Sequence, residues 1–173
     1  ILGANLQIPA THPLRSWVVP TLIKEVNGVK VGFFGLSYKG ALADPSPATI
    51  LPYLTIAPPT VNALRSAGAQ VVVCLTHFGM VRSRSLAGLV PGIDVIVNGH
   101  DNAVLEQPES VAQPGGGTTL IVSAGSYYRY VGRLRLLVNG GTVSVVDYAL
   151  LGADADTPSL PAVQQAIDAL KPG

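Results

Sequence analysis

The hydrophobic pattern of residues 67–102 consists of two similar halves. Each half is a run of apolar, mostly β-branched residues that stops abruptly at a polar tip, with VVVCLTHFG at 71–79 and DVIVNGHDN at 94–102. Such uninterrupted apolar runs are typical of strands that are buried on both faces of a parallel sheet. We therefore expect two parallel strands whose carboxyl ends carry His77 and His100. Ligands of open α/β sheets bind at this edge.

The rest of the pattern predicts further strands. Asn27–Gly28 and Asn139–Gly140–Gly141 each separate two strand-like segments, which predicts hairpins over 21–37 and 132–150. The run TTLIVSAGS, at 118–126, predicts another core strand, and residues 1–7 predict a short one.

Three helices and two irregular loops complete the predicted elements. We expect one helix to open at Pro58–Pro59–Thr60 and end at Gly68, a second to be capped by Ser83, and a third to follow Ser159. Their expected inward-facing residues are Val61, Leu64 and Ala67 in the first, Leu86, Leu89 and Val90 in the second, and Val163, Ile167 and Leu170 in the third. The composition of residues 38–57 and 103–117 predicts loops.

Composition limits the possible partners. The 173 residues suit one domain, 48% are hydrophobic and only 12% are charged, so we expect part of the surface to pack against something outside this chain. A net charge of +1 without a cluster of basic residues gives no footprint for nucleic acid or an anionic membrane. No apolar run approaches the ~18 residues that a membrane span requires.

Two of the three histidines lie at the predicted strand ends. Neutral imidazole is the commonest protein ligand for zinc-like metals, so His77 and His100 could share one ion. The alternative is that each is a hydrogen-bonded loop residue, but the repeated pattern favours the metal site. We expect His12 to be a surface residue and Cys74 to be a small core residue.

Two other features have competing interpretations. Tyr127, Tyr128 and Tyr130 follow a predicted strand, where they could pack together or form a wall of the metal site, and we favour packing. Gly32 and Gly35 lie within a strand without the G-x-G-x-x-G spacing, so we expect no glycine-rich cofactor-binding loop. A plain nucleotide-binding α/β domain is accordingly disfavoured.

Several motifs, taken in order, resemble those of a known family. LTHFG resembles a Ser/Thr-His-x-Gly motif and NGHDN a Gly-His-x-His or Gly-His-x-Gln motif of the calcineurin-like metallophosphoesterases, in the 5'-nucleotidase and UDP-sugar hydrolase branch. ILGANLQ, GVKVGFFGLS and SAGSYYRYVGRLRLLVNGG resemble further strands of the same catalytic domain. The match extends over nearly the whole chain.

This resemblance implies an α/β fold, namely half of a four-layer α/β/β/α sandwich with a mixed sheet and a terminal β-hairpin. Residues 1–173 would be the C-terminal portion of one catalytic domain, without its N-terminal half and without the separate C-terminal substrate-binding domain. The chain begins at Ile1 inside a predicted strand and its only methionine is Met80, from which we expect a processed, trimmed or partial polypeptide.

The resemblance also implies two divalent metal ions, such as zinc or manganese, and attack on the phosphate ester by a metal-bound hydroxide. His77 and His100 would bind one metal and Asn102 would reach the other, with no further catalytic residue in this chain. Asn102 departs from the His or Gln of the motif, and its amide oxygen suits harder cations better than zinc. Asp101 would be a turn residue, with a hydrogen bond to either histidine as an alternative.

The implied function is hydrolysis of nucleotide phosphate esters by the complete protein, within nucleotide catabolism. Nucleotide monophosphates, cyclic nucleotides and nucleotide sugars all remain possible substrates, and we expect this piece alone to be inactive. The alternative is a non-catalytic binding or structural domain that kept the fold and lost a complete metal site. The resemblance implies a periplasmic, cell-surface or secreted protein.

Overall fold

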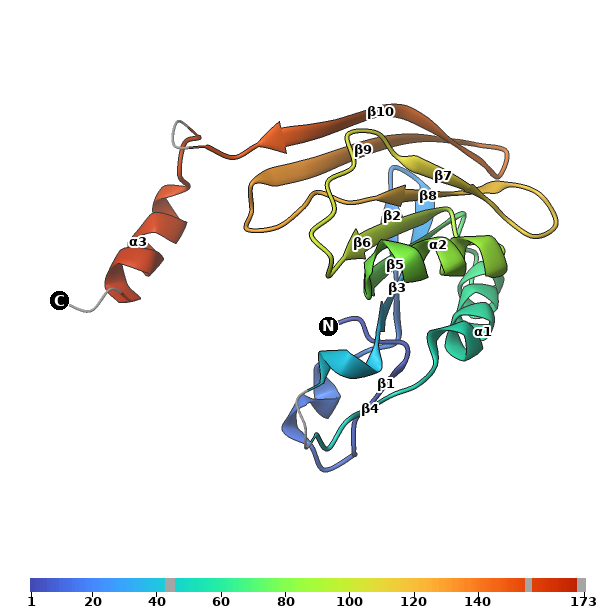
Figure 1. Ribbon diagram of the computed structural model, residues 1–173, viewed down its shortest axis with the longest axis horizontal. Coiled ribbons are helices and arrows are strands. Elements are labelled where there is room, and N and C mark those ends of the chain that lie inside the picture. Colours follow the sequence, from blue (N-terminus) through green and yellow to red (C-terminus); the bar gives the residue numbers. More distant parts are fainter. Residues whose placement is uncertain (43–45, 155–156, 171–173) are drawn as a thin grey trace.

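The computed structural model describes residues 1–42, 46–154 and 157–170, which are arranged in layers (Figure 1). Two helices, α1 (Tyr53–Ser66) and α2 (Gly79–Leu89), cover one face of a six-stranded sheet. A hairpin of β9 (Tyr130–Asn139) and β10 (Thr142–Gly152) covers part of the other face. The predicted mixed α/β fold with a terminal hairpin is thereby confirmed.

The central sheet is mixed, with strand order β2-β3-β5-β6-β8-β7. Its four inner strands are parallel, and each edge strand pairs antiparallel with its neighbour. The strands are β2 (Thr21–Val26), β3 (Val29–Ser37), β5 (Val71–His77), β6 (Val95–Gly99), β7 (Glu109–Ala112) and β8 (Thr118–Val122). The predicted hairpin of residues 21–37 and the two parallel histidine-bearing strands are both present.

The larger core lies between the sheet and helices α1 and α2. Its fully or nearly fully buried side chains include Phe34, Val61, Leu64, Val72, Leu86, Ile96 and Ile121. Cys74 is completely buried among them, and this burial raises the pKa of its thiol well above the ordinary value. The prediction that Cys74 is a core residue is confirmed.

The smaller core lies between the sheet and the hairpin. Val71, Val73, Val95 and Val122 face residues of the hairpin that include Leu134, Leu136, Val138 and Tyr148. The chain therefore provides part of a second β layer itself. The hairpin leaves the carboxyl ends of β5 and β6 partly uncovered, because Leu75 and Val97 remain 38% and 40% exposed.

Helix α1 begins at Tyr53, five residues before the predicted start, so Pro58 and Pro59 lie inside it. Each proline removes one helical N–H and therefore costs stability. Tertiary packing compensates, because the Tyr53 ring lies 4.8 Å from the Phe78 ring and Ala57 is completely buried. The end was predicted correctly, since Gly68 follows the helix with a φ of +90°. Ala67, which we expected to face inward, is exposed.

Helix α2 also begins earlier than predicted, at Gly79 rather than after Ser83. Ser83 is a buried residue within the helix, so the predicted N-cap role is wrong. Leu86 and Val90 face the core as expected, whereas Leu89 is exposed.

Three differences concern the predicted strands and loops. Strand β7 lies within the predicted loop 103–117, where a short and partly polar edge strand leaves little hydrophobic pattern. The predicted strand 1–7 is reduced to β1 (Leu6–Gln7), which pairs with β4 (Thr49–Ile50). Two short 3-10 helices, η1 (Pro13–Ser16) and η2 (Lys39–Ala41), also occur in irregular regions, and residues 43–45 of the predicted loop 38–57 lie outside the described residues.

Helix α3 (Pro161–Leu170) lies apart from the layers in Figure 1. Its predicted apolar face of Val163, Ile167 and Leu170 is present, and all three side chains are exposed. Within the described ranges, no helix is both long and apolar enough to cross a bilayer.

The hairpin layer yields a test with a matched pair of leucines. Leu136 faces the sheet, whereas its neighbour Leu137 is 56% exposed. We expect Leu136→Ala to lower the free energy of unfolding by about 1–2 kcal/mol, because a partly buried side chain is truncated. Leu137→Ala should change it by less than about 0.5 kcal/mol. Urea unfolding measures both, and equal losses would contradict the inward packing of β9.

Candidate functional site

The parallel register of β5 and β6 brings the two predicted histidines together. His77 ends β5 and pairs with Gly99, so that His100 follows immediately beside it. The two imidazole rings lie 5.1 Å apart between centroids, at an interplanar angle of 71°. Both residues are exposed. They lie at the carboxyl ends of β5 and β6, two strands that lie side by side in Figure 1.

The imidazole nitrogens are available to a ligand. Across the part of the chain that the structure describes, neither His77 nor His100 makes a side-chain hydrogen bond. Among the aromatic rings of the described residues, these two imidazoles contact each other, and the Tyr38 ring centroid lies 4.8 Å from that of His100. The Arg82 guanidinium in turn lies 5.4 Å from the Tyr38 ring centroid. His12 lies elsewhere and accepts a hydrogen bond from the Leu14 N–H.

Tyr38 was not identified from the sequence, and Arg82, whose basic pair with Arg84 indicated only a solvated face, was not assigned to the site. Tyr38 directly follows β3, which is a neighbour of β5 in the parallel part of the sheet. The signal that could have found it is therefore the same one that found the histidines, a polar tip after a parallel strand. The local pattern predicts only the hairpin of β3 with β2 and does not indicate that β5 pairs with its other side.

The backbone at the histidine tips depends on special conformations. A Cβ on Gly99 would lie 3.2 Å from the Thr76 carbonyl oxygen and 3.6 Å from His77 Nδ1, so glycine allows the two tips to approach closely. His100 itself has a φ of +93°, in the left-handed region that non-glycine residues rarely adopt. Strain of this kind costs of order 1–3 kcal/mol and concentrates at functional sites.

Asp101 lies in the bend after β6, as predicted, and it also makes two hydrogen bonds that the sequence did not indicate. Its Oδ2 accepts a hydrogen bond of 2.6 Å from the Met80 N–H, and its Oδ1 accepts one of 3.0 Å from Asn98 Nδ2. A hydrogen bond from Asp101 to His77 or His100 is not found among the described residues. Burial raises the pKa of this carboxyl, but these hydrogen bonds outweigh burial and leave the pKa below its ordinary value. Asp101 is therefore an anion at neutral pH.

A buried polar network lies beneath the histidines. The Ser83 hydroxyl donates to Asn98 Oδ1 at 2.8 Å and lies 3.0 Å from the Thr76 hydroxyl. The Ser123 hydroxyl donates to the Ala103 carbonyl oxygen at 2.7 Å. No buried side-chain nitrogen or oxygen within the described ranges lacks a hydrogen-bond partner. The network therefore joins the ends of β5, β6 and β8 to α2 without an unsatisfied group.

Asn102 lies in the same turn as His100, is exposed and has a φ of +57°. The backbone carbonyl oxygen of Asn102 is near the loop after β8, since a Cβ on Gly125 would lie 3.9 Å from it. The predicted donor set of His77, His100 and Asn102 thus follows two adjacent strands, but its role as a metal site stays a prediction. The described residues contain no group of three or more His, Cys, Asp or Glu side chains suited to a metal ion.

The tyrosines after β8 do not pack as expected. Tyr127 and Tyr128 are 87% and 94% exposed, and both have a φ near +58°. The prediction of aromatic packing is wrong for these two residues. Tyr130 is partly buried, with the Arg129 guanidinium 5.9 Å from its ring centroid.

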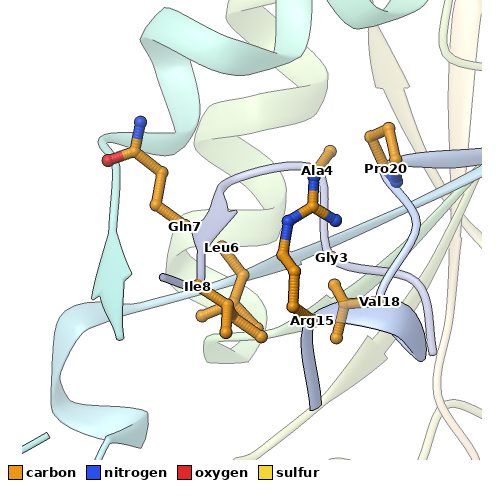
Figure 2. Close-up of a pocket in the computed structure, with 8 residues that line it drawn as sticks. All are labelled: Gly3, Ala4, Leu6, Gln7, Ile8, Arg15, Val18 and Pro20. Carbon is orange, nitrogen blue, oxygen red and sulfur yellow. The ribbon is translucent and has the colours of Figure 1, made fainter. Parts of the chain in front are cut away.

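Two hollows lie near the amino terminus. One, of about 320 Å³, borders His77 and is otherwise lined mainly by the first residues of the chain and by the ends of β3 and β5. The other, of about 370 Å³, contains neither histidine, and Arg15 is its one charged lining residue among those drawn in Figure 2. His77 is therefore accessible through the first hollow, next to the first residues of the chain.

The sequence relatives of this chain are phosphoesterases. It is 28% identical to a trifunctional nucleotide phosphoesterase of Bacillus subtilis over 99% of this chain and 13% of that protein. It is 29% identical to mouse 5'-nucleotidase over 72% of this chain and 23% of that protein. An uncharacterized metallophosphoesterase of Bacillus subtilis is 30% identical over 82% of this chain and 32% of that protein. No protein-family model matches the sequence.

A solved structure shows the same fold. The 5'-nucleotidase precursor of Thermus thermophilus superposes with a TM-score of 0.88 over 97% of this chain and 36% of its own, at 24% identity. The chain spans less than a third of the length of each of the three sequence relatives just described.

The close approach of Asp101 to α2 makes glycine necessary at position 79. Gly79 has a φ of +82°, and a Cβ there would lie 3.1 Å from Asp101 Oδ2. We expect Gly79→Ala to lower the free energy of unfolding by about 1–2 kcal/mol. The control Gly88→Ala, later in the same helix and with its nearest atom 3.9 Å away, should raise it by up to about 1 kcal/mol. Thermal or urea unfolding compares them, and a neutral Gly79→Ala would refute this contact.

For the strained tyrosine at position 128, we expect a substitution to raise stability rather than lower it. Tyr128→Gly should raise the free energy of unfolding by about 0.5–1 kcal/mol, because glycine relieves the left-handed strain and loses part of that gain as chain entropy. Tyr130→Gly, at the start of β9, should lower it, since that tyrosine is partly buried and has ordinary strand geometry. Urea unfolding decides, and a loss of stability in Tyr128→Gly would show that the exposed ring stabilises the loop.

Proposed function

We propose that this chain, whose sequence relatives and structural neighbours are 5'-nucleotidases and other phosphoesterases, carries part of the active site of a metal-dependent nucleotide phosphoesterase. The observation that carries the proposal is the pair of exposed imidazoles at the carboxyl ends of adjacent parallel strands. The presence of a metallophosphoesterase among the relatives supports a requirement for divalent metal.

The residues at this edge fit such an ion. His77 and His100 would hold it through ring nitrogens that make no hydrogen bond among the described residues, and neutral imidazole suits zinc-like metals. A bound divalent ion would polarise phosphate oxygens and lower the pKa of water. Asn102 would contribute an amide oxygen toward a second ion or toward the substrate. Two imidazoles and one amide are too few ligands for two ions, so the remaining ligands would come from the parent protein.

The other residues at this edge have supporting roles in the proposal. Tyr38 packs against His100 and limits the orientations of its ring. Arg82, in the first turns of α2, places a positive charge near the Tyr38 ring, which packs against His100, and would attract the anionic substrate. The substrate class is nucleotide phosphate esters. The precursor form of the Thermus neighbour supports a location outside the cytoplasm.

Histidine substitutions in the complete protein test the proposal. With manganese or zinc supplied, we expect His77→Ala and His100→Ala each to reduce hydrolysis of a nucleotide monophosphate at least about 100-fold, since a ligand that holds the ion is lost. Phosphate release measured against metal concentration also shows whether activity requires the ion.

His12→Ala is the matched control and should retain wild-type activity, because His12 is the N-cap of η1, away from the strand ends, where it accepts a backbone hydrogen bond. Unchanged metal-dependent rates in both strand-end variants would overturn the proposal. They would favour the alternative of a domain that binds without catalysing.

A further inference from the structure

We propose that Asp101 is a positioning residue, which sets the separation of His77 and His100 by capping the amino terminus of α2 from the neighbouring turn. The effect of this cap on metal binding rests on the proposed function, whereas its effect on the two rings does not. Asp101 itself would not touch the metal.

The first step is the position of the cap. Helix α2 begins two residues after His77, and its N-cap residue, Phe78, makes no side-chain capping bond. The first N–H groups of a helix have no partner within the helix and need an acceptor. Asp101 Oδ2 supplies one to the Met80 N–H at 2.6 Å. Since Asp101 directly follows His100, a single hydrogen bond joins the segments that flank the two histidines.

The second step is the hydrogen bonding of the same carboxylate to the buried polar network. Its Oδ1 accepts from Asn98 Nδ2 at 3.0 Å, and Asn98 in turn accepts from Ser83 in α2 at 2.8 Å. The Ser83 hydroxyl meets that of Thr76, one residue before His77, at 3.0 Å. Thr76, Ser83 and Asn98 are buried, so these bonds lie where competition from water is low.

The chemistry of the cap explains why aspartate suits this position. A carboxylate near a helix amino terminus is stabilised by the helix dipole, and its second oxygen remains free for Asn98. Gly79 has no Cβ, which lets Oδ2 come within reach of Met80. The result is a ring of contacts from β5 through α2 to β6 that fixes the two imidazoles 5.1 Å apart. Residues that orient metal ligands typically change metal affinity 10–100-fold.

The decisive experiment compares Asp101→Ala with wild type in the 173-residue chain, using two measurements. The first is the NOE between the His77 and His100 ring protons without metal, which reports their separation directly. The second is the affinity for Zn²⁺ by calorimetry. We expect Asp101→Ala to lose most of the NOE and to bind Zn²⁺ at least about 10-fold more weakly.

Two control variants separate positioning from general loss of stability. Val61→Ala opens space in the core beneath α1, and Glu109→Gln weakens the exposed ion pair that Arg84 of α2 makes with β7. Both should keep the NOE and the Zn²⁺ affinity. Asp101→Asn retains one acceptor oxygen and should give intermediate values, and it carries the same comparison if Asp101→Ala does not fold.

The outcomes distinguish this proposal from the proposed function. An unchanged NOE in both Asp101 variants, or an equal loss in Val61→Ala, would overturn the positioning role. If the NOE is lost in Asp101→Ala but the wild-type chain shows no Zn²⁺ binding that His77→Ala abolishes, the positioning role stands and the metal proposal is wrong for this chain.

Discussion

Parallel pairing of β5 with β6 is the interaction on which the candidate site depends. The register sets His77 opposite Gly99, and this pairing brings the following His100 beside the first imidazole. A slip of one residue would turn every side chain of one strand to the other face of the sheet. A slip of β5 would take Cys74 out of the helix-covered core, and a slip of β6 would take out Ile96, so the same burial that stabilises the fold also fixes the distance between the histidines.

The local signals of the sequence predicted much of the fold. The Asn27–Gly28 and Asn139–Gly140–Gly141 turns, the apolar runs before each histidine, and Gly68 at the end of α1 all act within a few residues. The starts of α1 and α2 were not predicted because distant contacts set them. Tyr53 packs against Phe78, and Asp101 caps α2 from the turn after β6, whereas Ser83 has the local pattern of a cap but is buried within the helix.

The candidate site shows the same division. His77 and His100 were identified because they repeat one pattern along the chain. Tyr38 and the role of Asp101 require knowledge of which strands and turns become neighbours, and this is absent from the local pattern. The left-handed conformations of Tyr127 and Tyr128 could not be predicted from the sequence either, since tyrosine does not favour them.

The attachment of the hairpin has a consequence for local unfolding. β9 and β10 pair with each other and form a sheet separate from the six-stranded one, which they contact through side chains. The Tyr148 hydroxyl also donates a hydrogen bond to the carbonyl oxygen of Leu105, in the loop before β7. The hairpin can therefore swing away as one cooperative unit without breaking a backbone ladder. We therefore expect amide hydrogens of β9 and β10 to exchange with solvent by such partial opening, whereas exchange in β5 and β6 should require unfolding of the whole sheet.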